Sequence, residues 1–293
     1  MTLPASITAL PCWSGTPSGT PLHGGLSNAI WRVTDAVGDH VVRLGRDYPF
    51  HHVDRAREVM VARAAHAAGF APAVEYSAPG VMVTQFLTAR TWSAEDLRAD
   101  PARVAVLLRR FHEEMPRRAE GAAFLFWPFH VIRDYLRQLS PGDGAAPIAA
   151  WQALNNALES VQPPLPLVFG HHDLLPANIL DDGQRLWLID YEYAGFGTCL
   201  FDLAGAASNA GMTAEQARAL LAAYLGRAPD AALTRAFDAM QVASLLRETL
   251  WALVSARHLA APGVDYAAYA ADNAARLAAA LDLYQTTHGK IAP

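Results

Sequence analysis

The stretch Gly170-His171-His172-Asp173-Leu174-Leu175-Pro176-Ala177-Asn178, followed by Leu188-Ile189-Asp190-Tyr191-Glu192, decides the fold of this chain. The tight turn Asp181-Asp182-Gly183-Gln184 lies between the two segments, and apolar runs typical of short strands flank both of them. An aspartate, an asparagine and a second aspartate are therefore expected on neighbouring strands and loops, in the spacing HxDxxxxN and then ID.

This set of side chains suits metal-assisted phosphoryl transfer. Negative charge spreads over the transferred group in that reaction, so the protein has to position the acceptor hydroxyl and hold Mg²⁺ against the phosphates. Mg²⁺ takes few protein ligands beyond the phosphates, and Asn178 with Asp190 meets that need. Asp173 is then expected to orient the acceptor hydroxyl and to receive its proton.

A different interpretation is that Asp173 caps a short turn and that Asp181-Asp182-Gly183 is an ordinary hairpin. Either half of the pattern alone is compatible with it. Both halves in this order, each bounded by strand-like apolar runs, favour the phosphoryl-transfer site.

The two segments resemble the catalytic loop and the metal-binding strand of the aminoglycoside phosphotransferase and choline/ethanolamine kinase superfamily, whose members share the protein-kinase-like fold. The second segment follows the ID-aromatic-E pattern of this superfamily rather than the DFG of protein kinases. The resemblance implies an α+β fold in two lobes: a small N-lobe of antiparallel sheet with one helix, and a larger, mostly helical C-lobe. It also implies ATP and Mg²⁺ as cofactors and a small-molecule alcohol as acceptor.

The composition argues against several other classes of protein. Hydrophobic residues make up 52% of the 293 residues and charged residues 17%, which is typical of a globular chain with a large core. No apolar run is long enough for a membrane span, and the N-terminus does not have the pattern of a signal peptide. A net charge of −5 provides no basic surface for nucleic acid and is compatible with a cationic substrate. The two cysteines suit the reducing cytoplasm.

The hydrophobic pattern predicts the elements of both lobes. The N-lobe, residues 1–87, has a hairpin over residues 29–34 and 40–44, a helix over 53–68, and two further strands at 73–76 and 81–86. The C-lobe, residues 88–293, holds the catalytic loop, the metal site and the acceptor pocket. Its helices are predicted over residues 93–97, 101–114, 131–139, 147–161, 213–225, 229–260 and 264–287.

The cation that grips phosphate is expected to be an arginine. Of the 23 basic residues only Lys290, near the C-terminus, is a lysine. Arg43 stands on an N-lobe strand where protein kinases use a lysine and where choline-kinase-like members often use an arginine. Its guanidinium can bridge phosphate oxygens and a carboxylate, and Glu58 on the following helix is the expected partner. The alternative is an incidental surface pair.

Two further segments are expected to contact the nucleotide. Gly24-Gly25-Leu26-Ser27-Asn28 is a turn of small residues, Gly24, Gly25, Ser27 and Asn28, whose backbone N–H groups can approach phosphate oxygens. A similar GG-x-[ST]-N turn occurs in members that resemble choline kinase, although a plain hairpin turn is the alternative. Gln85-Phe86-Leu87 ends the last N-lobe strand, where the backbone of Gln85, Phe86 and Leu87 can meet the edge of an adenine.

The acceptor pocket is predicted from a helix in the C-lobe. Glu248 and Trp251 stand three residues apart and share one helix face, and a carboxylate beside an aromatic ring suits an ammonium group. Tyr191 and Glu192 are further candidates beside the metal-binding aspartate. The alternative for Trp251 is a place in the core. Choline kinases of the eukaryotic type have a second tryptophan where this chain has Glu248, so a complete aromatic cage is not expected.

These features predict an ATP- and Mg²⁺-dependent kinase that phosphorylates a cationic amino alcohol such as choline or ethanolamine. His171 is expected to orient the backbone near Asp190, and Asp202 to brace the catalytic loop. One rival is a kinase for another alcohol, such as an aminoglycoside, thiamine or a sugar-like metabolite. A second rival is a nucleotide-binding pseudoenzyme, which would be expected to lack the base or a metal ligand.

Overall fold

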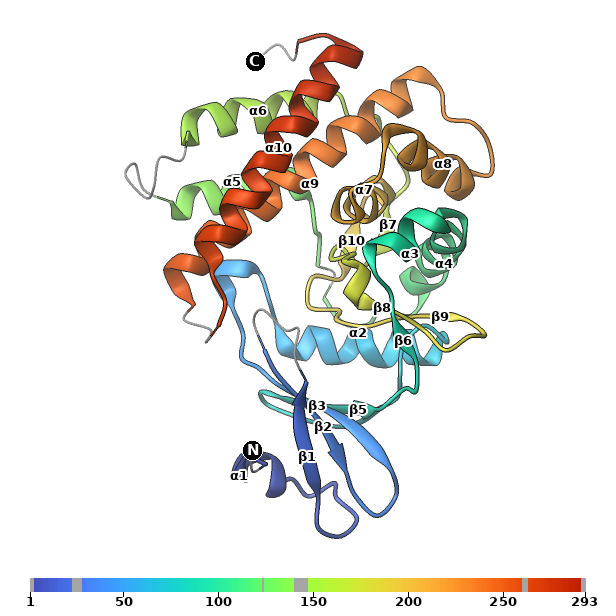
Figure 1. Ribbon diagram of the computed structural model, residues 1–293, viewed down its shortest axis with the longest axis vertical. Helices are drawn as coiled ribbons and strands as arrows, with labels where there is room; N and C mark the ends of the chain where they lie inside the picture. Colours follow the sequence, from blue (N-terminus) through green and yellow to red (C-terminus); the bar gives the residue numbers. More distant parts are fainter. Residues whose placement is uncertain (1–2, 23–27, 123, 140–146, 260–262, 291–293) are drawn as a thin grey trace.

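The computed structural model describes residues 3–22, 28–122, 124–139, 147–259 and 263–290. Its N-terminal part is a five-stranded antiparallel sheet in the order β1-β2-β3-β5-β4. The strands are β1 (Ser18–Leu22), β2 (Ala29–Thr34), β3 (Asp39–Leu44), β4 (Val74–Ala78) and β5 (Val81–Gln85). Helix α2 (Arg55–Ala67) lies between this sheet and the rest of the molecule (Figure 1).

Alternating side chains give the sheet two different faces. Val33, Val42 and Val83 are buried on one face, where they pack with Ile7 of the short helix α1 (Ala5–Thr8) in a small core of their own. Because side chains alternate along a strand, Arg43 projects from the opposite face, toward α2. Asp54 caps α2 by accepting a hydrogen bond from the backbone N–H of Arg57. These two features bring Arg43, the residue predicted to bind phosphate, and helix α2 together.

The C-lobe is mostly helical, as predicted. Its helices are α3 (Ala94–Ala99), α4 (Pro101–Glu114), α5 (Pro128–Gln138), α6 (Ile148–Ser160), α7 (Cys199–Ala210), α8 (Ala214–Leu225), α9 (Ala231–His258) and α10 (Tyr266–His288). Helix α9 runs through the centre of this lobe, packed against α5, α6, α7 and α10. Most of its side chains are buried, which is why it has no single apolar stripe.

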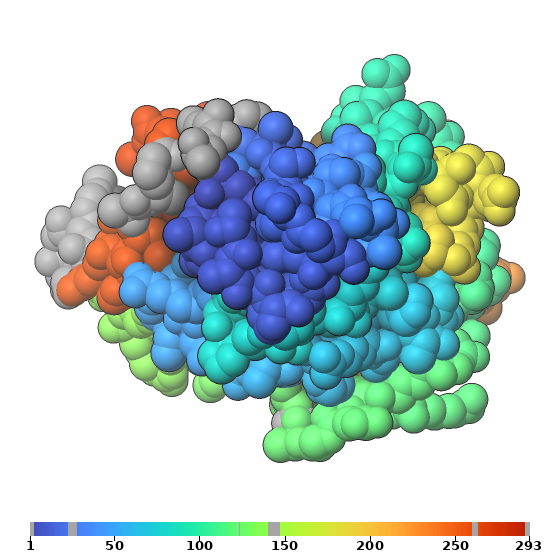
Figure 2. Space-filling model, turned by 90° about the horizontal axis from the view of Figure 1, so that it is seen from below, coloured from blue at the N-terminus to red at the C-terminus, as the bar shows by residue number. Residues whose placement is uncertain are grey.

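Short strands carry the catalytic segments. β7 (Val168–Gly170) pairs with β10 (Gly195–Gly197), and β8 (Ile179–Asp181) forms a hairpin with β9 (Leu186–Leu188). β6 (Arg90–Thr91) is the first strand after the N-lobe sheet. It pairs with β8 and so connects the end of the N-lobe to the predicted catalytic region. Seen from below, the N-terminal residues cover the middle of the molecule and the tip of the β8–β9 hairpin protrudes beside them (Figure 2).

The predicted α+β fold with an antiparallel N-lobe and a helical C-lobe is confirmed. Among the helices and strands of the described residues, α1, β1, β6, β10 and α7 were not predicted. The segment of β1 has a composition of Ser, Gly, Thr and Pro that is typical of loops, yet it pairs with β2 over five residues. Helix α7 is buried on nearly every side, so its sequence has no amphipathic period that would indicate a helix. The boundary between residues 87 and 88 stays a prediction.

The two lobes are also connected by a loop of the N-lobe that enters the C-lobe. The short helix η1 (Pro49–His51) lies in this loop, and His51 is buried. The two imidazole nitrogens of His51 lie 3.2 Å from the hydroxyl of Tyr135 on α5 and 2.8 Å from the hydroxyl of Ser255 on α9. The N-lobe is thereby attached to α9, the helix that was predicted to line the acceptor pocket.

Candidate active site

A buried aspartate of α7 holds the catalytic loop in place. The carboxylate of Asp202 accepts hydrogen bonds from the backbone N–H groups of His171, at 2.8 Å, and His172, at 2.6 Å. The Nε2 atom of His112 lies 2.8 Å from the same carboxylate. Burial alone would raise the pKa of Asp202, but the hydrogen bond with His112 and the neighbouring histidines lower it overall. Asp202 therefore remains a carboxylate that organises the loop backbone.

The two histidines of the loop have different positions. The Nε2 atom of His171 lies 2.9 Å from the carbonyl oxygen of Ile189, so its side chain links the loop to the metal-binding segment, where the sequence had suggested it. His172 has a positive φ of 63°, and its imidazole lies against the backbone of two glycines. A Cβ atom on Gly170 or Gly197 would come within 3.0 Å of this ring, so both positions require glycine.

Asp173 and Asn178 lie next to each other at the end of the loop. The amide nitrogen of Asn178 donates to the carbonyl oxygen of Asp173, at 2.8 Å, and approaches its Oδ2 atom at 3.3 Å. This orientation leaves the amide oxygen of Asn178 to face a cation. Burial raises the pKa of Asp173 well above its usual value, while the positive charge of Arg247 opposes that shift.

Asp190 is held in a strained backbone conformation. Its φ is 69°, which a residue with a Cβ atom rarely adopts and which is often found at functional sites. Its Oδ1 atom is buried and lies 2.8 Å from Nη1 of Arg43, with which it forms an ion pair. A buried carboxylate oxygen of this kind, together with the amide oxygen of Asn178, fits Mg²⁺, which needs only one or two protein carboxylates. Within the described ranges no three His, Cys, Asp or Glu side chains form a metal-binding group of their own.

Arg43 joins the two lobes through three carboxylates. Its guanidinium bonds to Glu58 on α2 and to Asp190, and its Nη2 atom donates to Glu192 at 2.8 Å. Burial would lower the pKa of Arg43, but the three carboxylates raise it overall, so the guanidinium stays charged. The expected pair of Arg43 and Glu58 is thus buried and belongs to a larger network.

A second arginine, Arg55, was not predicted and completes this network. Its Nη1 atom lies 2.7 Å from Glu58 and 2.8 Å from Glu192, and its Nη2 atom donates to the side-chain oxygen of Asn28 at 2.8 Å. Asn28 thus contacts the base of α2. Gly24, Gly25 and Ser27 lie outside the described residues, so the predicted phosphate-binding turn is described only at its last residue. A cavity of about 770 Å³ adjoins Arg43, Arg55 and the turn between β4 and β5.

The end of β5 differs in one respect from the expected adenine contact. The backbone N–H of Phe86 donates to the carbonyl oxygen of Asp39 at 3.1 Å, so it is not free for an adenine edge. The guanidinium of Arg32 lies 4.2 Å from the centre of the Phe86 ring. Gln85 is exposed and its N–H bonds to Ala73, while Leu87 is half-buried. Of this segment, only the backbone N–H of Leu87 has no hydrogen bond among the described residues.

The residues predicted for the acceptor are engaged with other protein groups. Trp251 is 5% exposed, stacks on His51 with ring centres 5.3 Å apart, and donates to the hydroxyl of Tyr193 at 2.9 Å. Glu248 accepts from Arg247 and from the hydroxyl of Tyr269, both at 2.8 Å. The carboxylate and the ring do lie on one face of α9, but both are packed against neighbours.

Tyr191 and Glu192 do not point toward an acceptor pocket. The ring of Tyr191 is buried against Phe111, and its hydroxyl donates to the carbonyl oxygen of Leu188. Glu192 is buried between Arg43 and Arg55. The tight turn after Asp190 sends both side chains into the interior, which the sequence alone could not indicate. Their expected role in substrate binding is therefore corrected to one in packing and in the arginine network.

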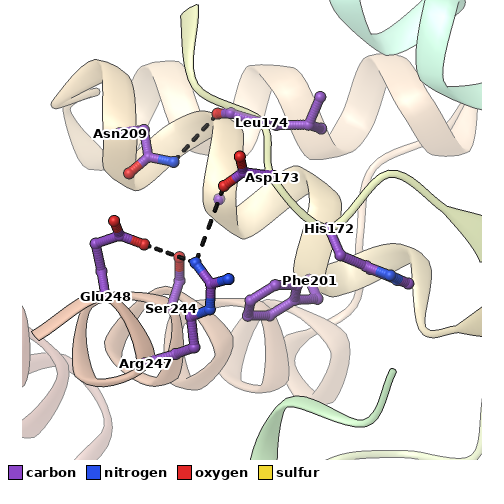
Figure 3. A pocket seen from close by; sticks show the side chains of 9 residues that line it. His172, Asp173, Leu174, Phe201, Asn209, Ser244, Arg247 and Glu248 are labelled. Atoms are coloured by element: carbon purple, nitrogen blue, oxygen red, sulfur yellow. Dashed lines mark hydrogen bonds and ion pairs between the residues drawn. The ribbon is translucent and has the colours of Figure 1, made fainter. Parts of the chain in front are cut away.

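Arg247, like Arg55, is a residue of the site that was not predicted from the sequence. It is 3% exposed on α9, and its Nη1 atom lies 2.8 Å from Glu248 and 3.9 Å from Oδ1 of Asp173 (Figure 3). A small cavity beside Asp173 is lined by Arg247, Glu248, Ser244 and Asn209. Arg247 and Glu248 are the only charged residues between positions 239 and 256, and such a pair in an apolar stretch indicates a buried interaction.

This fold and site define the class of protein. The profile of the phosphotransferase enzyme family (APH) matches residues 18–237, and the chain belongs to that family. Within it, the chain belongs to the choline/ethanolamine kinase branch: a choline/ethanolamine kinase family protein from Mesorhizobium loti has 31% sequence identity and a TM-score of 0.75, over 95% of this chain and 93% of that one. The predicted family is thereby confirmed.

Two other relatives extend the comparison. The choline kinase LicA from Streptococcus pneumoniae shares the fold, with a TM-score of 0.73 and 19% identity over 90% of this chain and 94% of that chain. A probable ethanolamine kinase from Arabidopsis thaliana is 26% identical over 197 residues, which are 61% of this chain. The match spans about half the length of this curated relative, 53%. No helix in the described part of the chain is both long and apolar enough to cross a membrane.

Proposed function

We propose that this protein is a kinase that transfers the γ-phosphate of ATP to the hydroxyl group of a small alcohol. The observation that carries the proposal is the meeting of Asp173, Asn178 and Asp190 with Arg43 of the other lobe. The family relationship supports the same class of reaction. Phosphoryl transfer needs a positioned hydroxyl, a metal site and a cation that binds phosphate. Asp173 meets the first need, Asn178 with Asp190 the second, and Arg43 the third.

Asp173 acts as the base. Its buried carboxylate accepts the hydrogen bond of the acceptor hydroxyl, aims the oxygen at the phosphorus and takes the proton as the new bond forms. Asn178 holds Asp173 in position through its amide nitrogen. Arg43 orients the nucleotide phosphates, and Glu58 and Glu192 keep its guanidinium fixed.

The cofactors are ATP and Mg²⁺. A structure of LicA in complex with AMP has the same fold, with a TM-score of 0.73 and 18% identity over 92% of this chain and 94% of that chain, which supports nucleotide binding by this fold. Asp190 and the amide oxygen of Asn178 would hold Mg²⁺, whose charge offsets that of the phosphates. A cytoplasmic location, proposed on the two free cysteines, remains part of the proposal.

The acceptor is proposed to be a small alcohol that carries an ammonium group. The names of the relatives, which include choline and ethanolamine kinases, support an amino alcohol. Glu248 and the hydroxyl of Tyr269 are the polar groups of α9 and α10 beside Trp251 that could receive the ammonium. An aminoglycoside would need several free carboxylates, and Glu192 is occupied by two arginines.

The proposal is tested by ADP release from ATP and Mg²⁺ with a panel of alcohols: choline, ethanolamine, thiamine, an aminoglycoside and simple sugars. We expect a small amino alcohol to stimulate ADP release above the rate with water. If ADP is bound but no alcohol stimulates turnover, the protein is a nucleotide-binding pseudoenzyme and the proposal is wrong. If thiamine, an aminoglycoside or a sugar is the preferred acceptor, the proposed kinase reaction is correct but the proposed class of acceptor is wrong.

A further inference from the structure

The guanidinium of Arg247 is buried within the C-lobe, beside Asp173. Its Nη1 atom bonds to Glu248 at 2.8 Å and lies 3.9 Å from Oδ1 of Asp173, while its centre lies 4.4 Å from the middle of the Tyr193 ring. A full positive charge therefore lies directly beside the proposed base. A site built only to receive an ammonium group has no need of such a charge, since like charges repel.

One edge of this guanidinium has no partner. The Nε and Nη2 atoms of Arg247 are buried, and neither makes a hydrogen bond within the described part of the chain. These two nitrogens share one edge of the guanidinium, and such an edge binds the two oxygens of a carboxylate in parallel. Buried donors are normally satisfied, so this unpaired edge indicates a ligand with oxygen atoms.

The position of Arg247 relative to Asp173 indicates that this ligand is part of the acceptor molecule and not of the nucleotide. The Oδ2 atom of Asp173 faces the amide of Asn178, on the proposed metal side, whereas its Oδ1 atom faces Arg247. Figure 3 shows the guanidinium of Arg247 rising from α9 toward Asp173, with Glu248 on one side and Phe201 on the other. The nucleotide phosphates already have Arg43. The free edge of Arg247 is thus more suited to a group on the acceptor than to the transferred phosphate.

The neighbouring groups argue against a cage for a quaternary ammonium. Both oxygens of Glu248 accept hydrogen bonds, one from Arg247 and one from the hydroxyl of Tyr269. One face of Trp251 is covered by His51, and Tyr266 and Tyr269 contact the same ring. Glu248 can still accept a hydrogen bond from a primary ammonium, because each carboxylate oxygen has two lone pairs. A trimethylammonium group cannot donate one.

We propose that Arg247 recognises a carboxylate on the acceptor, which is then a zwitterionic hydroxy amino compound. Its ammonium group bonds to Glu248, its carboxylate bonds to the Nε and Nη2 edge of Arg247, and its hydroxyl lies on Asp173. This inference rests on the proposed alcohol-kinase function and specifies its acceptor.

The test uses a matched pair of acceptors. L-Serine and ethanolamine differ only by a carboxylate, and choline carries the quaternary ammonium. We expect kcat/KM for L-serine to exceed that for ethanolamine by roughly 10-fold or more, since a charge-assisted bidentate contact is gained. Arg247→Lys keeps the charge but loses the two-donor edge. It should lower the ratio of kcat/KM for L-serine to kcat/KM for ethanolamine roughly 10- to 100-fold, chiefly through a higher KM for L-serine, whereas any effect on Asp173 is common to both acceptors and cancels in the ratio.

Each outcome decides between the alternatives. If the wild-type enzyme phosphorylates ethanolamine or choline but no acceptor with a carboxylate, the inference is wrong while the kinase function stands. If Arg247→Lys lowers kcat equally for every acceptor, Arg247 only positions Asp173 and the inference is also wrong. If no alcohol is phosphorylated, the proposed function itself fails. Arg257→Lys, at the exposed end of the same helix, is the control for the effect of the substitution on α9, and thermal melting verifies that both variants are folded.

Discussion

The carboxylate of Asp173 lies 3.9 Å from the guanidinium of Arg247, which is provided by a distant helix. Burial raises the pKa of Asp173, and Arg247 is the first of its neighbours that counteracts this rise. The charge state of Asp173, the proposed base, therefore depends on a residue outside its own loop.

Asp173→Asn should abolish phosphoryl transfer and leave nucleotide binding intact. The amide cannot take a proton, and loss of a general base costs about 10²- to 10⁴-fold in rate. ADP release in the presence of the preferred acceptor measures the first effect, and titration with ADP measures the second. Asp272→Asn, at an exposed position on α10, is the matched control. Turnover within tenfold of the wild type would show that Asp173 is not the general base.

Arg247→Met should move the acidic limb of the pH profile to higher pH. A base works only when deprotonated, so kcat/KM falls as the pH drops through the pKa of Asp173. The guanidinium lowers that pKa, and its removal raises it further. The measurement is kcat/KM of wild type and variant across the acidic range. An unchanged limb, or one at lower pH, would show that Arg247 does not control the charge of Asp173.

Arg43→Met should destabilise the fold as well as impair nucleotide binding. The substitution removes a cation from the buried carboxylates of Glu58 and Glu192 and from the half-buried Asp190. Breaking a buried ion pair by removing one partner costs about 3 to 5 kcal/mol. Urea denaturation measures the free energy of unfolding, with Arg46→Met as the exposed control. A decrease in unfolding free energy of less than about 1 kcal/mol would show that this ion-pair network does not contribute to stability as expected.

Asp202→Asn should lower stability at neutral pH by about 2 to 4 kcal/mol, because the amide nitrogen cannot accept the hydrogen bonds of the catalytic loop. The pKa of Asp202 in the folded protein lies below the ordinary value of 3.8. Its stabilising effect is thus complete above that value and is lost as the pH falls further. The difference between wild type and variant should stay constant from pH 8 to 5 and shrink below about pH 4. A difference that shrinks already between pH 7 and 5 would contradict this.

His51→Ala should loosen the contact between the lobes. His51 is neutral, since burial lowers its pKa to about 2, and it links Tyr135, Ser255 and Trp251. We expect a loss of about 2 kcal/mol in unfolding free energy and a higher KM for the acceptor. His51→Phe retains the stacking on Trp251 without the hydrogen bonds and should recover part of the acceptor affinity. Equal KM values for the acceptor in the wild type and both variants would show that His51 does not influence the acceptor site.

Much of the fold was predictable from local patterns. The predicted helix 101–114 has the bounds of α4. Its start is well defined by the sequence, because Asp100 caps the helix and Pro101 is its first residue. The hairpin of β8 and β9 follows from its turn residues. Helix α7 was missed because an element that is buried all round has no periodic signal, and β1 because its pairing partner, not its own residues, makes it a strand.

The sequence by itself indicated the proposed reaction class, because Asp173, Asn178 and Asp190 lie close together along the chain and their spacing is set by short strands and one turn. Only the tertiary structure decided which charges meet them. It packs Arg43 and Arg55 against Glu192, and brings Arg247 from α9 to the base. These contacts join segments distant in sequence, and in the low-dielectric interior each partner alters the charge state of the other. The charge balance of the acceptor site is therefore a property of packing rather than of any local motif.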